Sequence, residues 1–214
     1  MTRRAPPSVR ASAFLRDEGG ATLVEFAIVI SLFLLIFFGL IDFGRLAYHV
    51  VNSERAVHAA ARVAVVRPPA CPSVPTFVSL SGSAPAGTDY GTKCSAGANI
   101  CQAPATITCT GSAANPTAAE VWTQARVVLP PNSTIANLRF TYSYDPRLSF
   151  LGGPYVPVVT VALEGVDFDF VTPLSALARL AGAAPGGPSP GSSIPMPAIS
   201  VSLPGEDLAH GGNG

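Results

Sequence analysis

One uninterrupted apolar stretch, residues 21–41, constrains this chain more than any other feature. It is 21 residues long, and Glu25 is its one charged residue. A helix of that length measures about 31 Å, close to the hydrocarbon thickness of a bilayer. Residues 33–38 are all large and apolar, so the helix would be apolar on every side and would need lipid or a packed bundle around it. The stretch therefore predicts a membrane-spanning helix.

Glu25 is the anomaly in this helix, because a carboxylate in a spanning segment is costly and usually has a function. Two glycines, Gly19 and Gly20, end a polar, basic leader directly before the apolar run. A secretory signal peptide would have a shorter apolar region with a small-x-small cleavage site after it. Here the small residues come first, so cleavage beside them would remove the leader and keep the helix.

This arrangement resembles the type IV prepilin signal, in which cleavage after a glycine leaves glutamate and an aromatic residue at mature positions five and six. Gly20 would precede the cut, and Ala21 would become the first mature residue. Glu25 would then be the fifth residue and Phe26 the sixth. Glu25 would lie one helical turn from the new amino terminus, so it could pair with the terminus of this chain or with that of a neighbouring pilin. The resemblance implies the pairing with a neighbour, and the alternative is that Glu25 simply reaches the lipid headgroups.

Downstream residues narrow the resemblance. The strings at 39–45 and 59–64, together with the one at 20–27, look like the TadE-like family, the minor pilins or pseudopilins of tight-adherence (Flp/Tad) pilus systems. The resemblance implies a single-pass protein of the bacterial inner membrane with a cytoplasmic N-terminus and a periplasmic or extracellular C-terminal domain. Its implied partners are a prepilin peptidase, other pilins or pseudopilins, and Tad assembly proteins, and it implies no catalytic activity.

The helix is predicted to continue beyond the membrane. Apolar residues recur at spacings of three, four and seven over residues 42–67, and charged residues fill much of the other face. Pro68 and Pro69 then end it. Gly39 and Gly44 are candidates for close packing against another helix, with a mild kink or no role as alternatives.

All four cysteines lie in a region, residues 68–119, that is rich in Pro, Ser, Gly, Ala and Thr and is expected to be irregular. An even number of cysteines in a non-cytoplasmic region predicts two disulfides, with three possible pairings. A zinc site would require closely spaced cysteines or nearby histidines, so disulfides are favoured over metal, and reduced thiols are the remaining alternative. The cysteines are Cys71, Cys94, Cys101 and Cys109.

The rest of the chain, residues 120–214, is predicted to form a small β-rich domain. Strands are expected at 121–129, 135–144, 155–170 and 199–203, a short helix at 173–180, and a Pro/Gly-rich linker at 182–193. Gly165 indicates a bulge or bend. With a leader at 1–20 and a helix at 21–67, the expected fold is α+β and pilin-like, a long N-terminal helix followed by a small antiparallel β-domain.

Composition and motifs argue against other functions. Lys plus Arg and Asp plus Glu both number 13, and no basic patch alternates with aromatics, so nucleic-acid binding is not expected. His49 and His58 share one helix without a nucleophile nearby, and Asp167 and Asp169 favour a solvated edge over a cation site. No catalytic site, metal or cofactor is predicted. The alternative function is an unprocessed, bitopic membrane anchor whose periplasmic domain binds a ligand.

Overall fold

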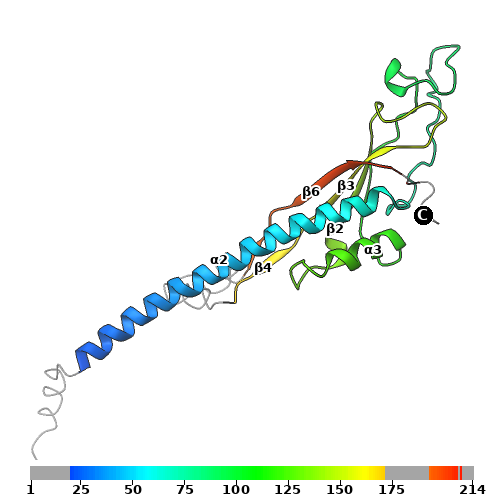
Figure 1. The fold of residues 1–214 in the computed structure, drawn as a ribbon. Helices are drawn as coiled ribbons and strands as arrows, with labels where there is room; N and C mark the ends of the chain where they lie inside the picture. The colour runs from blue at the N-terminus through cyan, green and yellow to red at the C-terminus, as the bar shows by residue number, and fades with distance from the viewer. Residues whose placement is uncertain (1–19, 172–192, 207, 209–214) are drawn as a thin grey trace, which may run out of the picture.

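The computed structural model describes residues 20–171, 193–206 and 208, with a long helix, α2, carrying a small domain beside its second half (Figure 1). The predicted leader, helix at 173–180 and linker at 182–193 lie outside the described residues, apart from Gly20 and Ser193. The elements are α2 (Ala21–Val65), η2 (Cys94–Ala96), β1 (Ile107–Thr110), α3 (Pro116–Ala125), η3 (Ile135–Asn137), β2 (Leu138–Tyr144), β3 (Pro157–Leu163), β4 (Asp167–Asp169), β5 (Ser193–Pro195) and β6 (Ile199–Pro204).

Helix α2 is continuous for 45 residues, which confirms the predicted long helix. Its first half is exposed, and Asp42 is the first buried side chain along the described part of the helix. Beyond it, small buried residues face the domain at helical spacing, and this small-residue face lets the backbone approach the sheet closely. They are Ser53, Ala56, Val57, Ala60, Ala61 and Ala64.

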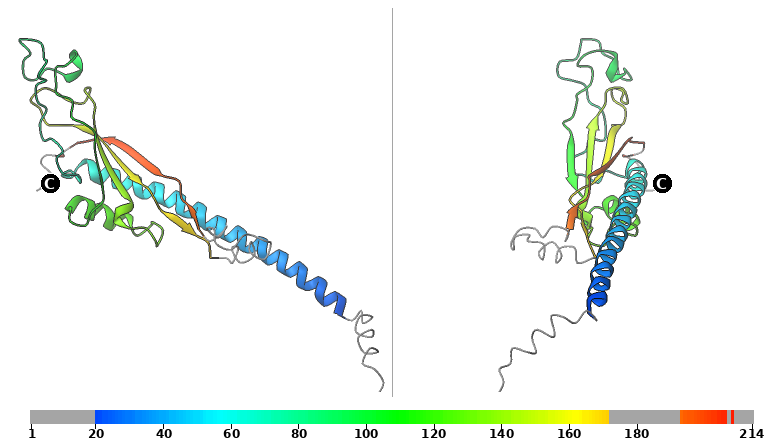
Figure 2. Two further views of the ribbon diagram at one scale, coloured as in Figure 1. Left: turned by 180° about the vertical axis from the view of Figure 1, so that it is seen from behind. Right: turned by 90° about the vertical axis from the view of Figure 1, so that its left-hand side faces the viewer.

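The domain is built on a four-stranded antiparallel sheet in the order β1-β2-β3-β6, with α2 running along one face (Figure 2). Phe140 of β2 pairs with Val161 of β3, which pairs in turn with Val201 of β6. Phe140, Tyr142 and Val161 are fully buried and join one core with the small residues of α2. The observed fold is thus α+β, a long apolar helix followed by an antiparallel sheet, as predicted.

The strand predicted over residues 121–129 is wrong, because residues 121–125 belong to helix α3 and residues 126–129 form turns and a bend after it. The side chain of Asn115 accepts a hydrogen bond from the Ala118 N–H at 3.0 Å, and Pro116 occupies the first turn. Both features stabilise a helix start. Val121 and Ala125, four residues apart, are buried against α2, so the apolar pattern there has a helical period.

Other strand predictions are confirmed with altered limits. The predicted strand over 155–170 is two strands, β3 and β4, separated near Gly165, whose φ of +65° favours glycine. The region 135–144 starts with the turn η3 before β2, and 199–203 forms β6. Two strands were not predicted: β1 lies within the region expected to be irregular, and β5 starts where the linker was expected to end.

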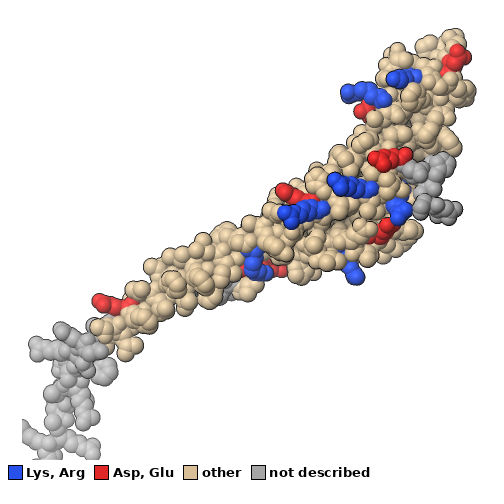
Figure 3. All heavy atoms as spheres, in the orientation of Figure 1, with Lys and Arg blue, Asp and Glu red and all other residues tan. Residues whose placement is uncertain are grey.

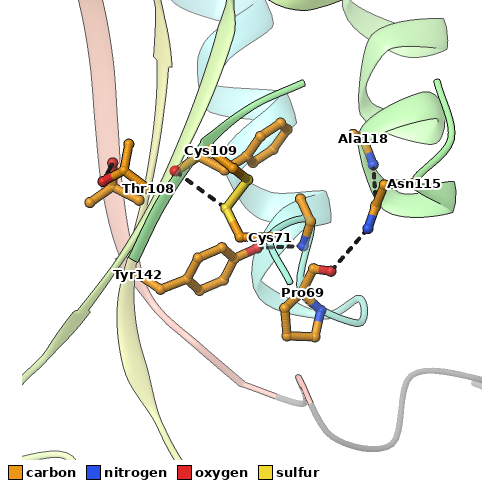
Figure 4. The surroundings of a disulfide bond; sticks show 10 residues. Pro69, Cys71, Thr108, Cys109, Asn115, Ala118 and Tyr142 are labelled. Carbon is orange, nitrogen blue, oxygen red and sulfur yellow. Dashed lines mark hydrogen bonds between the residues drawn. A yellow bond between two sulfur atoms is a disulfide. The ribbon is translucent and has the colours of Figure 1, made fainter. Parts of the chain in front are cut away.

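The two disulfides are Cys71–Cys109 and Cys94–Cys101, which confirms the predicted oxidation and selects one of the three pairings. The first joins the chain just after α2 to strand β1 (Figure 4). Beside it, the hydroxyl oxygen of Tyr142 accepts a hydrogen bond from the Ala70 N–H at 2.8 Å. The second closes a short loop within a separate small core at the distal end of the domain.

The two disulfides should stabilise the domain unequally. The separations of 38 and 7 residues correspond, in the loop-closure model, to about 4 and about 2 kcal/mol of lost unfolded-state entropy. We expect the double variant Cys71→Ala/Cys109→Ala to lose more free energy of unfolding than Cys94→Ala/Cys101→Ala. Denaturant unfolding in detergent measures the free energy of unfolding of both variants. The signal is the fluorescence of Trp122, the one tryptophan of the chain. Equal losses would contradict the loop-length argument.

Candidate functional site: the apolar helix and its junction with the domain

The start of α2 coincides with the predicted processing point. The helix begins at Ala21, directly after the exposed Gly20. A Cβ added at Gly20 would meet no atom of the described residues within 4 Å beyond its chain neighbours. The part of the chain that the structure describes therefore does not cover the backbone at this position.

Glu25 and Phe26 lie one turn inside the helix, and both are exposed. Phe26 keeps 65% of its surface. Among residues 20–171, 193–206 and 208, no cation forms an ion pair with Glu25. Glu25 lies four residues from Ala21, so its carboxylate and the backbone N–H of Ala21 lie on one side of the helix.

The apolar half of α2 is long and apolar enough to cross a membrane, with a mean hydropathy of 2.8 in its most apolar window, none of which is buried. Figure 3 shows this half without charged groups apart from one acidic group near its start, while the remaining charges lie along the domain. Gly39 and Gly44 lie towards its end, and a Cβ at either would meet no atom within 4 Å. Neither glycine therefore packs against the described part of this chain, and a contact with another helix stays a prediction.

The helix meets the domain at Asp42, whose side chain is only 1% exposed. Its Oδ1 accepts a hydrogen bond from Nη1 of Arg45 at 3.0 Å and another from the backbone N–H of Val171 at 3.3 Å. A buried carboxylate requires such partners to offset its lost hydration. Asp42 therefore ties the helix to the chain that follows β4.

An aromatic cluster surrounds this tie. Phe43 of α2 contacts Phe170 with ring centroids 6.1 Å apart, and Phe170 contacts Phe168 of β4 at 5.3 Å. The guanidinium of Arg45 lies 5.5 Å from the centre of the Phe168 ring, so it interacts both with the carboxylate of Asp42 and with an aromatic face. The sequence placed residues 42–45 in a family string and at the start of the amphipathic extension, with Asp42 and Arg45 on its polar face. The burial of Asp42 corrects that assignment. The partners of this segment, in β4 and just after it, could not be found from spacing, because they lie more than 120 residues away.

A comparison with protein families covers this helix. The model described as TadE-like protein matches residues 20–62. This stretch is TadE-like. The match starts at Gly20 and contains Glu25, Asp42 and Arg45, and it confirms the resemblance seen in the sequence. No curated protein and no solved structure matches the chain.

His49 lies in the same TadE-like stretch, two turns above Asp42. Its ring is 5.8 Å from that of Phe168, and its Nδ1 is buried without a hydrogen-bond partner among the described residues. Burial lowers the pKa of His49 below its usual 6.5, and the nearby positive charge of Arg45 lowers the pKa further. The folded protein thus favours the neutral imidazole.

Because the folded pKa of His49 lies below the unfolded value, the unfolded chain binds more protons at acidic pH. Stability should be fully present above about pH 6.5 and should fall as the pH drops below that value. We expect His49→Phe, which keeps an aromatic ring beside Phe168, to reduce this acid-induced loss. His58→Phe, at an exposed position of the same helix, is the matched control. Thermal unfolding midpoints of the two variants in detergent, measured above and below about pH 6.5, test this expectation. Identical dependence of the midpoint on pH in both variants would contradict the role of His49.

Proposed function

We propose that this chain is a non-catalytic pseudopilin that takes part in assembling a tight-adherence (Flp) pilus. The supporting observation is the placement of Gly20 and Glu25. Gly20 is exposed directly before a helix of membrane-spanning length, and Glu25 lies one turn inside it, within the stretch that the TadE-like model matches. A plain membrane anchor has no need of either residue.

The proposed topology has the leader in the cytoplasm, α2 across the inner membrane, and the sheet domain in the periplasm or outside the cell. Two observations support it. The leader contains four arginines, and cytoplasmic segments next to membrane helices are enriched in positive charge. The two disulfides lie in the domain, and disulfides persist in oxidising compartments outside the cytoplasm.

In this proposal, cleavage after Gly20 creates a free amine on Ala21, which is charged at neutral pH. The carboxylate of Glu25 would otherwise carry a penalty in lipid or take up a proton. Pairing it with the amine of a neighbouring pilin offsets that penalty and fixes the register between two helices. The exposed apolar face of α2 would supply the rest of the contact.

We expect the mature protein to begin at Ala21, because cleavage after Gly20 removes residues 1–20. Gly20→Leu should retain the leader, because a bulky residue would obstruct a peptidase that accepts a small one. Folding should be unaffected, since a side chain at Gly20 would contact nothing. Gly82→Leu, at another open position, is the control. Mass spectrometry of the N-terminal peptide of each protein, purified from cells that contain a prepilin peptidase, shows whether the leader has been removed. A wild-type protein that still begins at Met1 or Thr2 would refute processing.

Glu25→Gln should leave expression and membrane insertion intact but impair assembly. A loss of about 1.4 kcal/mol of association free energy per subunit contact corresponds to a tenfold weaker association. We therefore expect at least a tenfold decrease in co-purified pilins and in surface pili. Glu25→Asp should be partly defective, because its carboxylate is one methylene shorter. Glu54→Gln, on the exposed face of the second half of α2, is the matched control. Wild-type piliation by Glu25→Gln would exclude the charge pair.

A further inference from the structure

The chain just after strand β4 reaches the level at which the apolar run of α2 ends. The backbone N–H of Val171 donates to Oδ1 of Asp42, and Asp42 directly follows the apolar run of residues 21–41. Figures 1 and 2 show β4 running beside α2 towards the N-terminal half of the helix. The chain just after β4 therefore lies beside α2 at the level where the apolar run of the helix ends.

Apolar side chains are exposed at this level. Val171 keeps 74% of its surface and Phe43 keeps 59%, while Phe170 is half-buried between Phe43 and Phe168. We call Phe43, Phe170 and Val171 the collar. It continues the exposed apolar surface of α2 without a break, since Leu40 and Ile41 just below it are also exposed.

The collar lacks net charge. The carboxylate of Asp42, which lies behind it, is paired with Arg45 and bonded to the N–H of Val171. Of the acidic residues of β4, Asp167 lies further up the strand, and Asp169, which is exposed, directly precedes Phe170. An exposed apolar surface of this kind usually marks a protein or membrane contact, and its continuity with the spanning helix favours the membrane.

We propose that the collar is a second membrane contact, in which the chain just after β4 inserts into the boundary between lipid headgroups and acyl chains beside α2. Apolar and aromatic side chains are stable in that zone when they bury their surface there. Recognition would depend on apolar burial and not on anionic lipid. The contact would prevent the sheet domain from rising or turning relative to the membrane surface. This inference requires that α2 crosses a membrane but does not depend on the role in a pilus.

The experiment uses nitroxide depth measurements on the full chain, one copy per nanodisc. All four native cysteines are in disulfides, so an introduced cysteine is the one free thiol. The test position is Val171→Cys. Leu32→Cys, exposed within the apolar half of α2, serves as the lipid reference. The aqueous reference is Val66→Cys, another exposed valine, which lies 25 residues beyond Ile41 and thus about 37 Å along the helix axis.

At Val171 we expect oxygen, which concentrates in lipid, to reach the nitroxide as readily as at Leu32. A water-soluble nickel chelate should have several-fold less access than at Val66. This pattern should be the same in phosphatidylcholine discs and in discs with added phosphatidylglycerol. Nickel access equal to that at Val66 would overturn the proposal. Low access of both probes would show that protein covers the collar, and protection only with anionic lipid would show recognition by charge; either result would also overturn it.

Discussion

The structure depends on the way the end of α2 is fixed to the domain. Residues 67–71, which we call the clamp, contact three elements: helix α3 and strands β1 and β2. Arg67 makes a two-pronged ion pair with Glu120 of α3 at 3.1 and 3.2 Å. The carbonyls of the two prolines accept hydrogen bonds from the Thr117 and Asn115 side chains of the same helix region. Cys71 is then bonded covalently to β1, so α2 and the sheet domain cannot separate without unfolding.

Local sequence determined what could be predicted of this fold. The long helix follows from an apolar run of bilayer length, a three-four periodicity and a pair of prolines, all of which act within a few residues of one another. The alternation of Leu138, Phe140 and Tyr142 likewise predicted β2, because it reflects one buried face of a sheet. Gly20 and Glu25 could also be predicted as functional residues from local sequence, because the pattern they form depends on their short separation along the chain.

Features set by contacts between distant residues could not be predicted. The pairing of four cysteines is fixed by the path of β1 beside β2, which places Cys109 opposite Phe140 and next to the end of the clamp. Helix α3 was mistaken for a strand because its apolar residues mix with polar ones over a short length, and the signal in Asn115 and Pro116 was overlooked. The role of Asp42 depends on Val171, a partner 129 residues away.

The domain is thus held to one helix at two separate levels, by Asp42 at the end of the apolar run and by the clamp 25 residues further along, about 37 Å by the rise of an α-helix. A domain attached to a helix at one point could rotate about that point, whereas attachment at two separated points prevents such a rotation. Any turn or shift imposed on the apolar half of α2 would therefore appear as the same motion at the far end of the domain. The two attachments thus let the helix pass a movement of its apolar half to a surface at the opposite end of the molecule.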